Sequence, residues 1–164
     1  MRGDTPATTR PMLIYTLYTH LLPAPCDWES ELPRIAAMGF THVAVAGQID
    51  TTDPTVALFC AKARSLRLTA LAVMPASNWG EGGASLQTGI AAVLAAGWDG
   101  VRVVDPGSVT FEDWSRVITA IRTEFPDAVL IADTVGVKQA NIVQLAATGF
   151  DAMVDSGAWW DGKA

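Results

Sequence analysis

Six short apolar runs, rich in β-branched residues, recur along the chain and are separated by longer amphipathic stretches. The centres of neighbouring runs lie 23 to 33 residues apart. Short apolar runs that alternate with helical patterns at this spacing predict βαβ units, whose parallel strands are buried on both faces. The predicted strands cover residues 12–18, 42–46, 68–74, 100–105, 128–134 and 150–155.

The stretches between these runs carry the start and stop signals of helices. Thr110 is followed three residues later by Asp113, a variant of the capping box. A glycine followed by an aromatic residue ends three of the helical patterns, at residues 39–40, 97–98 and 149–150. This dipeptide predicts a left-handed glycine and an aromatic side chain under the next strand. The predicted helices run through residues 28–38, 53 or 55 to 63, 86–96, 110–125 and 138–148.

Two parallel α/β architectures fit this alternation, an open doubly wound sheet and a (β/α)₈ barrel. A dinucleotide-binding sheet requires G-x-G-x-x-G after its first strand, and neither this fingerprint nor a phosphate-binding P-loop is present. A complete barrel takes about 250 residues, whereas the six predicted βα units already occupy nearly all of the 164 residues in this sequence. The sequence therefore predicts an α/β fold with about six βα units of a TIM barrel.

Composition narrows the class of protein. The chain has 164 residues, of which 50% are hydrophobic and 17% charged, with a formal net charge of −6. The high hydrophobic content excludes a disordered protein. The acidic net charge leaves no basic stripe that could bind the phosphate backbone of a nucleic acid. No apolar run is long enough to span a membrane. We expect a single domain over residues 12–164, a flexible leader over residues 1–11 and a cytoplasmic location.

The few cysteine and histidine residues do not form a recognisable metal-binding or cofactor-binding motif. Cys26 and Cys60 form no CxxC pair and are too few for a disulfide framework. His20 and His42 stand far apart, with no cysteine or carboxylate cluster at ligand spacing. We therefore expect neither a metal site nor a cofactor.

Four segments resemble, in order and spacing, the α-amylase superfamily, glycoside hydrolase family 13. They are LPRIAAMGF at residues 32–40, GWDGVRVVD at 97–105, ADTVG at 132–136, and GFD with SGAWWD between residues 149 and 161. The last pair is most similar to the bacterial α-1,4-glucan:maltose-1-phosphate maltosyltransferases and their degenerate N-terminal barrel modules. The resemblance implies a retaining glycosidase-type barrel that acts on α-1,4-glucan or maltosyl units.

The resemblance also indicates where catalytic residues would stand. Arg102 matches the family's arginine, but the nucleophile position, two residues later, is Val104. The acid position holds Asp133 in place of a glutamate, and the third carboxylate follows a seventh strand. The Asn-His pair expected after the third strand is replaced by residues 74–79. These departures imply impaired chemistry.

Asp105 leaves two interpretations open. A one-residue shift in strand register would make it a nucleophile, with Asp133 as acid and Arg102 beside them. Alternatively, Asp105 begins a strand-end turn with Pro106 and Gly107, and Asp133 is hydrogen-bonded to a loop.

Four further residues are candidates for binding sugar. Trp79 and Asn78 lie in a polar, glycine-rich stretch after the third strand, where an indole would stack on a sugar ring or cover the barrel mouth. His20 follows the first strand, and is either a hydrogen-bonding ligand or a solvated side chain. Trp159 or its neighbour Trp160 faces the interior, and the other faces the rim or a partner.

Three functions remain open. The first is a catalytically impaired amylase-type module that binds α-glucan or accompanies a catalytic domain. The second is an active retaining transferase or hydrolase that uses Asp105 and Asp133. The third is a barrel fragment whose open strand edges pair in a homo-oligomer.

Overall fold

The computed structural model describes residues 11–19, 28–47, 50–79 and 83–154. The side chains of Glu29, Asn78 and Trp79 lie outside this description. Residues 1–10, the greater part of the predicted leader, lie outside it as well. The elements in chain order are β1 (Ile14–Tyr18), α1 (Trp28–Ala37), β2 (His42–Ala46), α2 (Pro54–Ser65), β3 (Thr69–Pro75), the 3-10 helix η2 (Ala76–Trp79), α3 (Gly83–Ala95), β4 (Gly100–Val104), the 3-10 helix η3 (Pro106–Ser108), α4 (Phe111–Glu124), β5 (Val129–Asp133), α5 (Gln139–Ala146) and β6 (Ala152–Val154).

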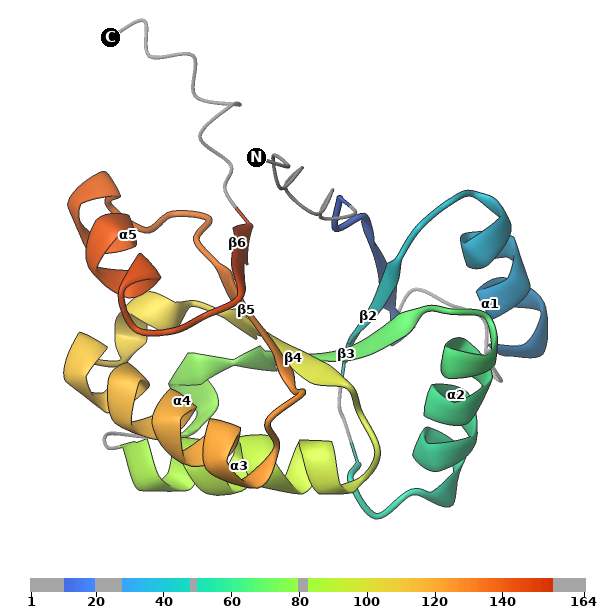
Figure 1. Cartoon of the computed structure of the whole chain (residues 1–164), viewed down its shortest axis with the longest axis horizontal. Coiled ribbons are helices and arrows are strands. Elements are labelled where there is room, and N and C mark those ends of the chain that lie inside the picture. The colour runs from blue at the N-terminus through green and yellow to red at the C-terminus, as the bar shows by residue number, and fades with distance from the viewer. Residues whose placement is uncertain (1–10, 20–27, 48–49, 80–82, 155–164) are drawn as a thin grey trace, which may run out of the picture.

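The six strands form one parallel sheet in the order of the sequence. Figure 1 shows the sheet curling into an arc, with the helices on its convex side. The predicted fold, six βα units of a barrel, is confirmed. None of the described helices is both long and apolar enough to cross a membrane.

Strand alternation divides the apolar residues between the two faces of the arc. Residues of one parity face the helices and form the main core, which includes Val43, Ala70, Val101 and Leu130. Residues of the other parity face the concave side, where Ala44, Leu71 and Ile131 are completely buried in a second cluster. This two-sided burial explains why the strands read as continuous apolar runs in the sequence.

The predicted glycine–aromatic turns are confirmed, and a third residue completes each one. Gly39, Gly97 and Gly149 all have positive φ, and the aromatic residues that follow them contact the main core. In two of the three turns the next residue is an aspartate, Asp99 or Asp151. Each aspartate joins the start of a strand to the end of a helix.

The two aspartates make equivalent contacts. Asp99 accepts from Arg64 Nε of α2 at 2.6 Å and from the backbone N–H of Ala70 in β3 at 2.8 Å. Asp151 accepts from Arg122 Nη2 of α4 at 2.6 Å and from the backbone N–H of Leu130 in β5 at 2.7 Å. We call this arrangement the Arg–Asp clamp. It recurs every second βα unit and satisfies a strand amide that would otherwise need water.

The first turn carries a neutral version of the same contact. Thr41 stands in the aspartate position, and its hydroxyl accepts from the backbone N–H of Leu13 at 2.9 Å. The same hydroxyl donates to the carbonyl of Leu13 at 3.2 Å. The underlying repeat is therefore two βα units long.

Arg67, the second residue after the end of α2, occupies a left-handed conformation with φ of 60°. A side chain in this region costs about 1 kcal/mol, which glycine avoids at the expense of a more flexible unfolded chain. We expect Arg67→Gly to raise the free energy of unfolding by about 0.5 kcal/mol, measured by urea titration. Arg67→Ala, which keeps the β-carbon, is the control and should give no gain; an equal gain in both variants would contradict the strain argument.

Candidate functional site

The strands of a parallel barrel end at one edge, where functional residues of this fold gather. We call this edge the carboxyl edge. Continuous register places Pro75, Val104, Asp133 and Val154 side by side in one row of the concave face. One row below them lie Val73, Arg102, Ile131 and Ala152.

Arg102 and Asp133 form a largely buried ion pair on the concave face. Arg102 Nη2 donates to Asp133 Oδ2 at 2.5 Å, and only 16% and 9% of the two side chains are exposed. The other carboxylate oxygen of Asp133 accepts from the backbone N–H of Val135 at 3.3 Å. The structure thus brings together two of the three predicted catalytic residues.

Thr16 of β1 completes this group, although it is not among the residues predicted from the sequence. Arg102 Nη1 donates to Thr16 Oγ1 at 3.0 Å, across the concave face from β4 to β1. Arg102 Nε is buried and has no hydrogen-bond partner among the described residues. In the sequence, the signal that could have identified Thr16 is a polar residue at an inward-facing position of an otherwise mostly apolar strand.

Asp105 lies outside the group formed by Arg102, Asp133 and Thr16. Strand β4 pairs with β5 without interruption up to Val104, so the register shift considered from the sequence is absent. Asp105 follows in a left-handed conformation with φ of 55°, begins η3, and is exposed. Its carbonyl accepts from the Ser108 amide and hydroxyl. This is the geometry of a strand-end turn.

The predicted sugar-binding residues are only partly visible. Asn78 and Trp79 belong to η2, which directly follows β3 and lies beside η3 at the carboxyl edge. His20 and Trp159, together with Trp160 and Cys26, lie outside the described residues. The role of all four candidates in binding sugar stays a prediction.

Two other titratable side chains have altered pKa values without forming a reactive group. Burial lowers the pKa of His42, and the negative charge of Asp99 partly opposes this shift. The Nδ1 atom of His42 lies 2.7 Å from Thr41 Oγ1. Burial raises the pKa of Cys60 to about 12, so its thiol is protonated at neutral pH. Neither residue lies on the carboxyl edge.

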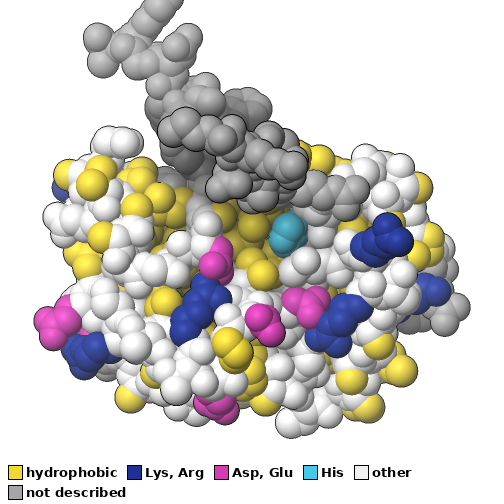
Figure 2. Space-filling view, viewed as in Figure 1, with side chains coloured by type: hydrophobic (Ala, Val, Ile, Leu, Met, Phe, Trp, Pro, Cys, Tyr) yellow, Lys and Arg dark blue, Asp and Glu magenta, His cyan; other side chains and the backbone are white. Residues whose placement is uncertain are grey.

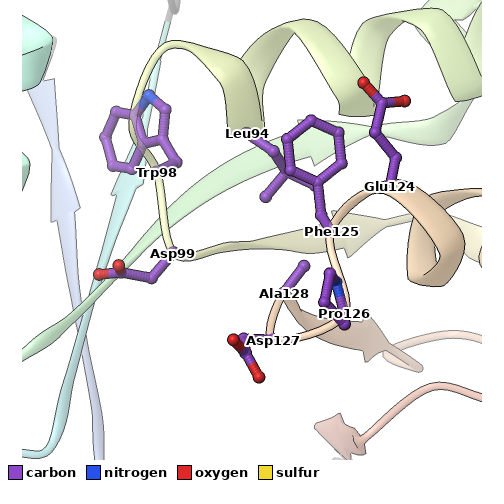
Figure 3. A pocket seen from close by; sticks show the side chains of 8 residues that line it. All are labelled: Leu94, Trp98, Asp99, Glu124, Phe125, Pro126, Asp127 and Ala128. Atoms are coloured by element: carbon purple, nitrogen blue, oxygen red, sulfur yellow. The ribbon is translucent and has the colours of Figure 1, made fainter.

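Figure 3 shows a cleft at the opposite edge, between the ends of α3 and α4, with a volume of about 310 Å³. The carboxylates of Asp99, Glu124 and Asp127 line it but point in different directions (Figure 3). Asp99 is already held by Arg64. In the described part of the chain, no three His, Cys, Asp or Glu side chains are placed to hold a metal ion.

Charges of both signs are spread over the face shown in Figure 2, where acidic side chains lie against basic ones. The clamps Arg64–Asp99 and Arg122–Asp151 are ion pairs of this kind. On this face, the basic side chains are therefore accompanied by acidic ones.

No protein-family model and no curated protein matches the chain. Among solved structures, it is similar to the α-amylase of Geobacillus thermoleovorans complexed with acarbose, with a TM-score of 0.69 and 14% identity over 90% of this chain and 52% of that one. The maltogenic α-amylase AmyB of Thermotoga neapolitana gives a TM-score of 0.68 and 15% identity over 91% and 50%. A putative deoxyribose-phosphate aldolase of Coccidioides immitis gives 0.61 and 15% over 87% and 58%.

These similarities establish the fold. The chain spans about half the length of the two α-amylases. An aldolase and two amylases share this architecture, so the fold does not by itself decide the chemistry.

Proposed function

We propose that the chain is an α-amylase-type module, related to the maltosyltransferases, that binds α-1,4-glucan or maltosyl units at its carboxyl edge and has lost catalysis. The four sequence segments of the amylase superfamily and the shared barrel fold support this proposal. Within it, we place the module in the cytoplasm, where it accompanies a catalytic domain.

The observation that carries the proposal is the row formed by Val104 and Asp133. A retaining mechanism requires two carboxyl groups about 5 Å apart. Asp133 is the one carboxylate among the described concave-face positions, and Arg102 already binds it. A valine in the nucleophile position cannot attack an anomeric carbon.

A second candidate, an active retaining transferase or hydrolase, rests on Asp105. This residue is exposed at the carboxyl edge in a strained backbone conformation, and strain of this kind gathers at functional sites. For catalysis, its carboxylate would have to turn towards Asp133.

Titration with maltoheptaose, followed by tryptophan fluorescence and a parallel assay for reducing sugar, distinguishes the two candidates. The proposed function predicts a saturable fluorescence change without release of sugar. Maltose-1-phosphate should likewise release no phosphate. A β-1,4-linked oligosaccharide of equal length should produce no change, because the barrel edge is expected to select α-linked chains.

Two tryptophan variants serve as a matched pair. Trp79→Ala should reduce the fluorescence change at least tenfold, whereas Trp28→Phe should preserve it, because Trp28 packs against Phe59 in the helical layer. Turnover that disappears in Asp105→Asn would establish the second candidate instead. Absence of both binding and turnover would refute both.

A further inference from the structure

Trp98 carries a buried hydrogen-bond donor that the fold leaves unused. Only 6% of this residue is exposed, and among the described residues its Nε1–H has no acceptor. In Figure 3 this nitrogen lies on the side of the indole ring that faces away from Asp99 and Asp127, so these carboxylates do not accept from it. A buried donor without an acceptor destabilises a fold. A bound molecule that carries an acceptor would remove this cost.

A cavity on the convex side of the sheet borders Trp98 and has a volume of about 200 Å³. Buried or half-buried apolar side chains form its interior, and two exposed aspartates stand at its mouth. We call it the aromatic cavity, with Trp28, Val45, Phe59 and Trp98 in the interior and Asp50 and Asp53 at the mouth. Since Val45 belongs to the main core, the cavity lies on the opposite face of the sheet from Arg102 and Asp133.

Three aromatic rings determine what shape of molecule the interior accepts. Trp28 and Phe59 pack edge to face with their ring centroids 4.9 Å apart, and the rings of Phe59 and Trp98 lie tilted at 5.6 Å. Aromatic walls of this kind favour a further ring, packed edge-on or offset against them. A cavity of about 150 Å³ holds one benzene molecule. The aromatic cavity therefore has room for one aromatic ring with a short chain.

The mouth of the aromatic cavity is negatively charged. The hydroxyl and the backbone N–H of Thr52 donate to Asp50 Oδ1 at 2.7 and 2.8 Å, and these bonds lower the pKa of Asp50. Asp53 is the N-cap of α2 and accepts from the backbone N–H of Thr55 at 2.8 Å. The described residues that line the cavity include no lysine or arginine. The mouth therefore attracts a cation and disfavours an anion.

We propose that the aromatic cavity binds a small arylalkylamine whose ring bears an oxygen at the end away from the amine. The ring packs among Trp28, Phe59 and Trp98. The ammonium group pairs with Asp50 and Asp53, and the oxygen accepts from Trp98 Nε1–H. A sugar matches the cavity less well, because hydroxyl groups around its ring would be buried against aromatic side chains without partners. This site is independent of glucan binding at the carboxyl edge.

Calorimetric titration of the full chain with three related compounds tests the proposal. Tyramine, which has both an amine and a phenol oxygen, should bind saturably. Phenethylamine lacks the oxygen and should bind about fivefold more weakly, which is the loss of one hydrogen bond. The compound 3-(4-hydroxyphenyl)propionate carries a carboxylate in place of the amine and should not bind.

Variants that preserve side-chain shape locate the two ends of the ligand. Asp50→Asn and Asp53→Asn remove a charge but keep an acceptor, including the N-cap of α2, and each should weaken tyramine binding about tenfold. Asp127→Asn, at an exposed position of the opposite edge, changes the net charge equally and should leave binding unchanged. Trp98→Phe keeps a ring without the donor, so tyramine should then bind no better than phenethylamine.

Four results would overturn the proposal. They are the absence of saturable tyramine binding, equal binding of the propionate, tyramine binding that both aspartate variants leave unchanged, and displacement of tyramine by maltose, which would assign the cavity to a sugar. Circular dichroism checks that each variant is folded. If Trp98→Phe does not fold, the comparison of tyramine with phenethylamine and the two aspartate variants still decide the outcome.

Discussion

Replacing Asp133 with alanine is expected to lower the free energy of unfolding by about 3 kcal/mol. Asp133 and Arg102 are largely buried, and removal of one partner leaves a buried charge that water cannot solvate. The amide of Val135 loses its acceptor as well. Urea denaturation followed by circular dichroism measures the change, which appears as a lower midpoint at an unchanged slope.

The double variant Arg102→Met with Asp133→Leu is the control for this interpretation. Replacing both members of a buried ion pair with apolar residues of similar volume is often neutral, so the double variant should recover most of the lost stability. A double variant as unstable as Asp133→Ala would show that the loss does not arise from an unpaired guanidinium. A stable Asp133→Ala variant would show that the pair contributes little to the fold.

The fold was predictable because a short stretch of sequence specifies each strand and helix. Each strand is a short apolar run, and the start of α4 is marked by Thr110, whose side chain accepts from the backbone N–H of Asp113 as predicted. Helix α3 was the least accurate case. It begins at Gly83, three residues before the predicted start, because its first residues are small and carry no capping signal.

The concave-face group was predictable only in part. The motif around residues 97–105 indicated Arg102, and strand alternation placed Val104 on the same face. The partners of Arg102 lie 31 and 86 residues away in the sequence. Contact with Thr16 depends on the curvature of the whole sheet, which no local pattern specifies.

The Arg–Asp clamp is an intermediate case. The sequence pattern predicts the glycine and the aromatic residue of each turn, but it does not connect the following aspartate to a helix. Its contact with Arg64 depends on how α2 packs beside β3, which periodicity does not describe. Two aspartates in equivalent positions were nevertheless visible in the sequence as a repeat of Gly-aromatic-Asp.

Gly100, directly after the clamp residue Asp99, should tolerate no side chain. A β-carbon there would lie 2.0 Å from the carbonyl oxygen of Val129 and 2.8 Å from its carbonyl carbon. These are backbone atoms of the paired strand, which cannot rotate away as a side chain can. We expect Gly100→Ala to lower the free energy of unfolding by about 3 kcal/mol, measured by urea denaturation, because β4 and β5 must separate.

Two other glycines separate this steric effect from backbone strain. Gly97 has φ of 111° and open space where a β-carbon would stand, so Gly97→Ala should cost only the strain of about 1 kcal/mol. Gly107 has neither strain nor a close neighbour, since its nearest contact is a methyl of Val137 at 4.0 Å, and Gly107→Ala should be neutral. If Gly97→Ala proved as costly as Gly100→Ala, backbone conformation rather than strand contact would be the cause. We predict that Gly100→Ala costs far more stability than Gly97→Ala. This order follows only if β4 and β5 pack backbone to backbone at Gly100.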